Sequence, residues 1–278
     1  MTGILVKPKY LLGHFLVLLI VISCFMLSSW QFSRLNERRE LNSKISSRMN
    51  NKAIDLKDIS KGYDKDLEEE AFIKDNEYRR ISLTGEFRKS GSVLILGRSQ
   101  KGDPGYNIMV PMDVLINEKA KILFINVGFI STTLGEAITF DNVPISNVFP
   151  KIGDGKTYTF EGLIRKNEAK SLFGSDEQVQ ENKTSNRIDV NLYKDRIGNT
   201  ESKILQKNFW VELVKYTGIK VVDKYPDPIE LPELSEKNHF SYAIQWVMFG
   251  FIAIITWSVI CFKAKKSSKV NNSTTKGK

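Results

Sequence analysis

Two long apolar runs bracket the chain. Residues Tyr10–Phe32 and Phe240–Phe262 each pass 23 residues without a charge, which is enough helix to cross the ~30 Å hydrocarbon core of a bilayer. The pattern predicts two transmembrane helices that flank a polar domain, with a short tail at either end. The expected boundaries are 1–9 for the N-terminal tail, 10–32 for the first span, 33–238 for the domain, 239–262 for the second span and 263–278 for the C-terminal tail.

The first run also has features of a cleaved signal peptide. Lys7 and Lys9 supply a positive start, but the run is longer than the apolar core of a signal peptide. The stretch Val21–Cys24 loosely resembles a lipoprotein cleavage site, yet the apolar residues continue beyond it. The interpretation we favour is a retained helix.

Apolar and polar residues alternate through much of the middle of the chain, which is typical of half-buried strands. In Tyr78–Phe87, for example, Ile81, Leu83 and Phe87 alternate with polar residues. The fold class we expect is therefore a membrane protein with two transmembrane helices flanking a mainly antiparallel β (α+β) extracytoplasmic domain. Its other predicted strands are Val93–Leu96, Tyr106–Ile116, Lys121–Val127, Thr157–Ile164 and Asn208–Tyr216.

Turn formers and prolines divide these strands. Gly102–Gly105 reads Gly-Asp-Pro-Gly, which predicts a turn, and Pro111 implies a sheet edge or a bulge. The polar stretch 166–207 is expected to be an irregular insertion. In the last strand, Phe209, Val211 and Leu213 alternate with Trp210, Glu212 and Val214.

Both ends of the domain have their own patterns. Leu35, Leu41, Ile45 and Met49 recur near helical spacing, so a helix is expected to continue beyond the first span. At the other end, a stiff extended connector back to the membrane is predicted from Pro226, Pro228 and Pro232.

Of the net charge of +9, eight units belong to the tails, which carry eight lysines and no acidic residue. The domain keeps 33 basic and 32 acidic residues, so it lacks the charge excess that nucleic-acid binding needs, and no nucleic-acid partner is expected. Short basic segments stay in the cytoplasm, whereas long domains cross regardless of charge. Both termini are therefore expected to be cytoplasmic and the domain periplasmic.

Histidine and cysteine occur only in the apolar segments, as His14, Cys24, His239 and Cys261. The domain therefore lacks the base of a Ser-His-Asp triad, a cysteine nucleophile and the usual ligands of zinc and copper. Carboxylate chemistry stays possible, although no acidic pair stands out, and we expect no catalytic residue. His14 is expected to bond within the helix pair, and the cysteines to lie too far apart for a disulfide.

The start of the second span carries candidate ligand chemistry. In a helix that begins at His239, Tyr242, Trp246 and Gly250 fall on the same face as the histidine. An imidazole ligand, flat aromatic rings and a glycine that allows close approach would suit a haem, with His239 on the iron. The alternative is an interfacial histidine with aromatic-belt neighbours.

The end of the first span is expected at the same membrane level. Trp30 would add an aromatic wall, and the guanidinium of Arg34 would pair with a haem propionate. The predicted cofactor site therefore consists of His239, Tyr242, Trp246, Trp30 and Arg34.

Motifs along nearly the whole chain occur in a fixed order between the two spans. They are Trp30-Gln31, Arg34-Leu35, Tyr78-Arg79, Gly85-Glu86-Phe87, Arg98, Gly102–Tyr106, Pro111, Asn126, Gly128, Gly162–Arg165 and Asn238–Trp246. Together they resemble the surfeit-locus (Surf/Shy) assembly factors of cytochrome c oxidase, found in mitochondria and respiring bacteria.

The chain departs from the pattern of that family at three places. The family's Asn-Arg-Gly-Trp-Val-Pro reads Asn-Val-Gly-Phe-Ile-Ser over Asn126–Ser131, so a role of that arginine is in doubt here. Its Trp-Lys reads Glu37-Arg38, and Ser29 stands where the family has a glycine before Trp30.

The resemblance implies a non-enzymatic chaperone of the respiratory chain. It would help to mature the large subunit of the oxidase alongside other assembly factors. The family is thought to bind haem a, with the histidine that matches His239 as candidate ligand. A bacterial inner membrane is the expected location, because the N-terminal tail lacks the Arg- and Ser-rich composition of a transit peptide. The mitochondrial inner membrane is the alternative.

Two other functions are compatible with the pattern. One is a docking scaffold for oxidase subunits that holds no cofactor, in which His239 would be dispensable. The other is a membrane-anchored hydrolase that uses carboxylates, whose activity would lie in the domain alone.

Overall fold

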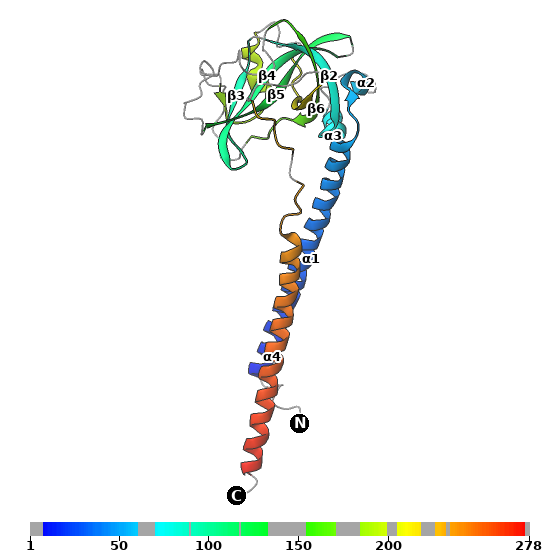
Figure 1. Ribbon diagram of the computed structural model, residues 1–278. Helices are drawn as coiled ribbons and strands as arrows, with labels where there is room; N and C mark the ends of the chain where they lie inside the picture. The colour runs from blue at the N-terminus through cyan, green and yellow to red at the C-terminus, as the bar shows by residue number, and fades with distance from the viewer. Residues whose placement is uncertain are drawn as a thin grey trace. The chain divides into compact units, whose positions relative to one another are not determined.

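Contacts divide the computed structural model into two units. The helical unit comprises Met1–Lys44 and Glu233–Lys278, and the barrel unit comprises Ile45–Pro232. Figure 1 colours both along the chain. The structure describes residues 8–60, 70–88, 90–116, 118–132, 154–170, 184–198, 205–217, 226–231 and 234–275.

Two long helices supply the helical unit, α4 (His239–Thr275) and α1 (Pro8–Asn50), whose last residues from Ile45 belong to the barrel unit. Each is long and apolar enough to cross a membrane, and only 11% and 6% of their apolar windows is buried. A core helix of a water-soluble protein would bury most of that surface, so the exposure fits two membrane-spanning helices. The helix predicted beyond the first span is confirmed, because α1 continues to Asn50.

The two helices run antiparallel along a seam of mostly small and apolar residues. The Ser28 hydroxyl donates to the carbonyl of Ala243 at 3.1 Å, and Gly250 faces Cys24. Buried or half-buried positions recur at intervals of three and four, as in a coiled coil. They are Gly13, Val17, Val21, Cys24, Ser28, Gln31 and Leu35 on α1, and His239, Ala243, Trp246, Gly250, Ala253, Trp257 and Cys261 on α4. Small residues in this seam let the two backbones approach closely, and both cysteines are free.

Five strands of the barrel unit close into a ring (Figure 1). Its order is β2 (Arg80–Phe87), β6 (Thr157–Lys166), β8 (Phe209–Tyr216), β5 (Lys119–Ser131) and β4 (Asp103–Ile116), which pairs back to β2. Every step is antiparallel except β5 to β8, which is parallel. The predicted mainly antiparallel β domain is confirmed.

Shorter elements extend this ring. The strand β3 (Val93–Gln100) pairs with β4, β1 (Ile54–Asp55) with β2, and β7 (Thr184–Ser185) with β3. Three short helices complete the described part of the unit: α2 (Leu56–Ser60), α3 (Glu70–Asn76) and the 3₁₀ helix η3 (Val190–Arg196).

Alternate residues of the five ring strands form the interior core. Ile81, Leu83 and Phe87 of β2 belong to it, as the alternation predicts, and α2 and α3 add Leu56 and Phe72. Phe72 packs on Phe209 with ring centroids 5.3 Å apart. Because the ring is closed, its interior needs no second sheet to cover it.

A second core lies on the outer face of the sheet. Phe124 and Trp210 from the ring pack there with Val190 and Tyr193 of η3 and with Leu205. The half-buried pattern expected for β8 is therefore wrong, since Trp210 and Glu212 are only 3% exposed. A strand that is covered on both faces loses its alternation of burial even where its sequence alternates.

The turn expected at Gly102–Gly105 begins one residue earlier. Lys101 and Gly102 both have positive φ, 55° and 88°, and Gln100 pairs with Asp103, so the two residues form a tight hairpin. Asp103 already belongs to β4. The expectation of a sheet edge or bulge at Pro111 is wrong, because β4 is an inner strand and its register shift against β5 lies between Ile108 and Met109. Pro111 instead sits where β4 changes its partner from β3 to β2 and needs no N–H there.

The proline-rich segment is more than a connector. Phe129 and Asp227 exchange backbone hydrogen bonds at 2.8 and 2.9 Å, and the Pro228 carbonyl accepts from the Gln100 side chain. Residues 226–230 are thereby tied to the edge of the barrel. Pro232 and much of the predicted insertion lie outside the described residues.

Candidate functional site in the helix pair

His239 is the first residue of α4, and its imidazole turns toward α1. Its Nδ1 lies 2.9 Å from Oε1 of Gln31, and the side chain is half-buried. Gln31 occupies the seam position that follows Ser28, so the same face of α1 makes the Ser28 hydrogen bond and the contact with His239. Within the described residues, only the Nδ1 side of His239 has a hydrogen-bond partner.

The aromatic residues predicted around His239 do not share one face. Trp246 is half-buried in the seam and meets the Phe249 ring edge-on, with centroids 5.7 Å apart. Tyr242 points outward and is 50% exposed. The reason is the spacing: the seam proceeds from His239 by four residues to Ala243 and then by three to Trp246, so Tyr242 falls beside it.

Trp30 and Arg34 lie together on the outward side of α1. The guanidinium carbon of Arg34 is 5.8 Å from the centroid of the Trp30 ring, and Nη1 is 2.7 Å from a carboxylate oxygen of Glu37. More than half of both charged side chains is exposed. Exposed pairs of this kind contribute little free energy, so Arg34 can exchange Glu37 for another carboxylate at small cost.

The structure therefore brings together Trp30 with Arg34, and separately His239 with Gln31. Gln31 is the residue that the predicted site omits, although it belongs to the same motif as Trp30. The signal that identifies it is the seam periodicity of α1, which places residue 31 toward α4 and residue 30 away from it.

The second histidine makes the opposite kind of contact. Trp257 donates its Nε1–H to Nδ1 of His14 at 2.7 Å, and the two rings meet at 89° with centroids 5.3 Å apart. The expectation that His14 bonds within the helix pair is confirmed. Gly13 beside it makes room for the Trp257 indole.

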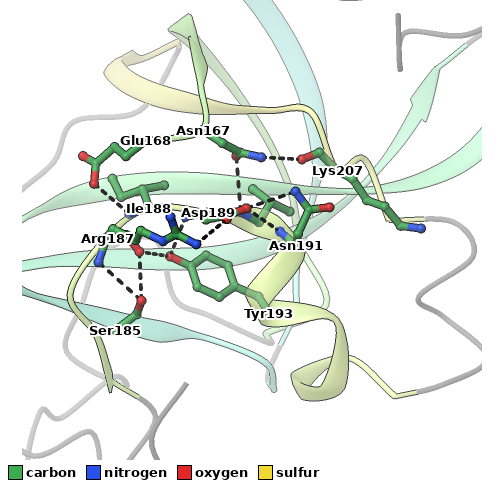
Figure 2. Close-up of polar contacts among 10 residues, drawn as sticks. Asn167, Glu168, Ser185, Arg187, Ile188, Asp189, Asn191, Tyr193 and Lys207 are labelled. Atoms are coloured by element: carbon green, nitrogen blue, oxygen red, sulfur yellow. Dashed lines mark hydrogen bonds and ion pairs between the residues drawn. The ribbon is translucent and has the colours of Figure 1, made fainter. Parts of the chain in front are cut away.

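Carboxylates of the barrel unit serve a different purpose. Figure 2 shows Asp189 accepting hydrogen bonds from the Asn191 backbone and from Arg187, while Glu168 accepts from the backbone of Ile188. The buried Tyr193 hydroxyl donates to the Arg187 carbonyl at 2.8 Å, and burial raises the pKa of this phenol well above its usual range. These groups hold η3 against the sheet.

Metal and acid–base chemistry find no support in that network. Among the residues that the structure describes, no three His, Cys, Asp or Glu side chains group as a metal site. Each named carboxylate of Figure 2 already accepts hydrogen bonds from backbone or arginine donors. The network is therefore structural.

Comparison with known proteins assigns the chain to a family. The family model described as SURF1 family matches residues 18–251. The chain belongs to the SURF1 family. This match confirms the resemblance read from the sequence motifs. SURF1 proteins are associated with the assembly of cytochrome c oxidase.

Individual SURF1 relatives are distant. Uncharacterized SURF1-like proteins of Mycobacterium bovis and of two strains of Mycobacterium tuberculosis are each 20% identical over 263 residues. These matches cover 90% of this chain and 83% of each relative. The span matched by the SURF1 model contains Gln31, His239 and Trp246, whereas His14 and Trp257 lie outside it.

Proposed function

We propose that this SURF1 protein is a non-enzymatic assembly factor that holds haem a at the start of α4 and passes it to the large subunit of cytochrome c oxidase. The haem is cargo in this proposal, an iron-centred redox group whose chemistry belongs to the oxidase. The chain's own task is to bind the group, orient it and release it.

One observation carries the proposal: His239 has its Nδ1 engaged by Gln31 while its Nε2 is left without a protein partner among the described residues. A histidine binds haem iron through one ring nitrogen, and its other nitrogen is normally held by a hydrogen bond. Its place at the first residue of a membrane-spanning helix puts the imidazole near the water boundary, where a macrocycle with an apolar body and charged edges would be accommodated.

The neighbouring residues take separate roles in the proposal. Trp246, half-buried seven residues along the seam from His239, would pack against the macrocycle. Arg34 would exchange Glu37 for a propionate, with Trp30 stacked beside it. Tyr242 points away from the seam, so its contribution would be to the lipid-facing wall.

The barrel unit supplies the docking surface in this proposal. With both tails in the cytoplasm, as their lysines favour, the barrel lies in the periplasm of a bacterial inner membrane. There it meets the oxidase large subunit or other assembly factors.

Haem retention by the purified protein tests the ligand. The full chain, produced in cells that make haem a, should purify with a haem a absorption spectrum. His239→Ala should lose most of that absorbance, whereas His14→Ala should keep it, because His14 already receives the Trp257 N–H. Equal retention by the wild type and His239→Ala would contradict the proposal.

The alternative of a cofactor-free scaffold is separated by a second measurement. Deletion of the gene should lower oxidase activity under both hypotheses. Under the haem proposal, His239→Ala expressed in the deletion strain should restore the oxidase subunits to the membrane but leave the large subunit poor in haem a. Full activity with His239→Ala would favour the scaffold.

A further inference from the structure

The two histidines of the chain are held by partners of opposite polarity. Oε1 of Gln31 only accepts hydrogen bonds, so the proton between it and His239 must reside on Nδ1 of the imidazole. The Trp257 indole only donates, so Nδ1 of His14 must be the acceptor and the proton of that ring must reside on Nε2.

We infer that Gln31 is a positioning residue that fixes His239 in the Nδ1–H tautomer and so keeps the Nε2 lone pair available for a metal ligand. The inference rests on the proposed function for the identity of that ligand, haem a iron. It names a residue of α1 as the second half of a site whose first half lies on α4.

The position of Gln31 in the fold restricts the movement of its side chain. It lies in the seam between two long helices, one helical turn from Ser28, whose hydroxyl is bonded to the Ala243 carbonyl. A side chain fixed at such a point loses little further freedom when it bonds the imidazole. An unconstrained histidine favours the proton on Nε2, which would block the nitrogen that points away from α1. The hydrogen bond reverses that preference.

The same reasoning excludes the other histidine as a metal ligand. His14 also lies in a membrane-spanning helix, but the indole N–H occupies its Nδ1 and leaves a proton on Nε2. Neither nitrogen of that ring then offers a lone pair. The chain thus contains a matched pair, one imidazole prepared to bind a metal and one prepared not to.

Nitrogen NMR on the full chain in detergent tests the tautomers without any haem. Because there are only two histidines, ¹⁵N-histidine labelling gives four ring-nitrogen signals at pH 8. We expect the Nε2 of His239 to be of the unprotonated type and the Nε2 of His14 of the protonated type. Gln31→Leu should move the His239 proton to Nε2 and leave the His14 signals unchanged, which also verifies that the helix pair still forms. Trp257→Phe should alter only the His14 signals.

Haem a affinity supplies the second readout. Loss of the outer hydrogen bond to a metal-binding histidine typically weakens binding by about 10–100-fold, and we expect a loss of that order for Gln31→Leu. Gln31→Glu, a stronger acceptor, should retain binding and lower the reduction potential of the bound haem. Because the added negative charge would itself lower the potential, the tautomer signals are the readout that a merely structural role of Gln31 would not change.

The outcomes separate the two claims. A protonated Nε2 on His239 in the wild type, or a tautomer that Gln31→Leu does not change, would overturn the role of Gln31. Haem binding that requires His239 but is equal in wild type and Gln31→Leu would do the same while leaving the proposed function intact. A wild type with the expected tautomers that retains no haem a would instead overturn the proposed function.

Discussion

Arg165 and Glu212 form an ion pair on adjacent strands of the barrel, with Nη1 and Oε2 2.6 Å apart and only 4% of the glutamate side chain exposed. The guanidinium also lies over the rings of Tyr78 and Trp210, 4.7 and 5.5 Å from their centroids. It therefore compensates a buried charge and packs between two aromatic side chains at once.

Arg165→Met should destabilise the barrel severely. Removing one partner of a buried pair leaves an uncompensated charge, at a cost of about 3–5 kcal/mol. The matched control is Arg88→Met, since Arg88 pairs with an Asp113 that is 49% exposed, and such pairs contribute about 1 kcal/mol or less. Urea unfolding followed by circular dichroism compares the two. Equal losses of unfolding free energy in the two variants would contradict the claim that burial makes the Arg165–Glu212 pair more important.

The loss of unfolding free energy in Arg165→Met should also depend on pH. Burial raises the pKa of Glu212 above its usual range, and Arg165 opposes that rise by favouring the carboxylate. For an acid whose pKa is raised on folding, stability is greatest below the unfolded pKa and falls as pH rises through the folded value. Without Arg165 the pKa rises further, so acidification from neutral pH should narrow the gap between variant and wild type. A gap that widens on acidification would argue against this assignment.

Arg39 and Glu236 should form an acid-sensitive clip within the helical unit. The guanidinium meets the carboxylate in bidentate fashion, at 2.8 and 3.1 Å, and Asn42 donates to the Ser235 carbonyl beside it. The hydrogen bond from Arg39 lowers the pKa of Glu236. The contribution is therefore present above the ordinary glutamate pKa and is lost as pH falls through the lowered value.

Hydrogen exchange of residues 234–238 measures this clip. Exchange should accelerate on acidification, after correction for the intrinsic pH dependence, and should also accelerate in high salt because the pair is exposed. Glu236→Gln should exchange rapidly at every pH. The idea fails if the variant and wild type protect this segment equally at neutral pH.

Two glycines of the helix seam should respond to alanine with opposite signs. A Cβ on Gly13 would overlap the Trp257 indole, whereas a Cβ on Gly250 would lie 3.6 Å from the Cβ of Cys24, an ordinary contact. Gly13→Ala should therefore cost about 1–3 kcal/mol through overpacking, while Gly250→Ala should be neutral or stabilise by up to about 1 kcal/mol. Thermal unfolding in detergent compares them, and the His14 NMR signals should shift in Gly13→Ala alone.

The β3–β4 hairpin offers a stabilising change. Lys101 has a φ of 55°, in the left-handed region that costs a lysine roughly 1–2 kcal/mol. Lys101→Asn would create Asn-Gly, the favoured pair for a turn of this shape. We expect a gain of about 0.5–1 kcal/mol in urea unfolding. Lys101→Val should destabilise the barrel. A valine variant more stable than the asparagine variant would contradict the turn geometry.

Much of the fold follows from patterns that the sequence displays openly. Two uncharged runs predict two long helices. Period-two alternation locates the strands that are buried on one face only, as in β2, where Ile81 and Leu83 face the barrel interior. The two-sided burial of β8 could not be predicted, since Trp210 is covered by η3, a segment without apolar periodicity of its own. Closure of the ring is equally hidden, because no local signal pairs β4 with both β3 and β2.

The candidate site could be predicted in part. A lone imidazole at the start of an apolar run singles out His239, but counting a step of three and then a step of four from that residue selects Tyr242 and Trp246 together. The seam of two antiparallel helices alternates steps of four and three, so it keeps Trp246 and rejects Tyr242. Gln31 depends on how the helices are matched along their length, which is a property of the pair and not of either sequence segment.

The parallel step from β5 to β8 has a consequence for biogenesis. During synthesis β5 emerges early, yet its second neighbour is the last described strand of the barrel, so a nascent chain carries an open hydrogen-bonding edge until β8 is synthesised. The next described helix is α4, so sealing of the barrel and arrival of the second anchor fall in the same final stage of translation. A ribosome that stalls before Tyr216 would leave a tethered, half-built ring with bare edges, which marks it as a natural substrate for quality-control proteases.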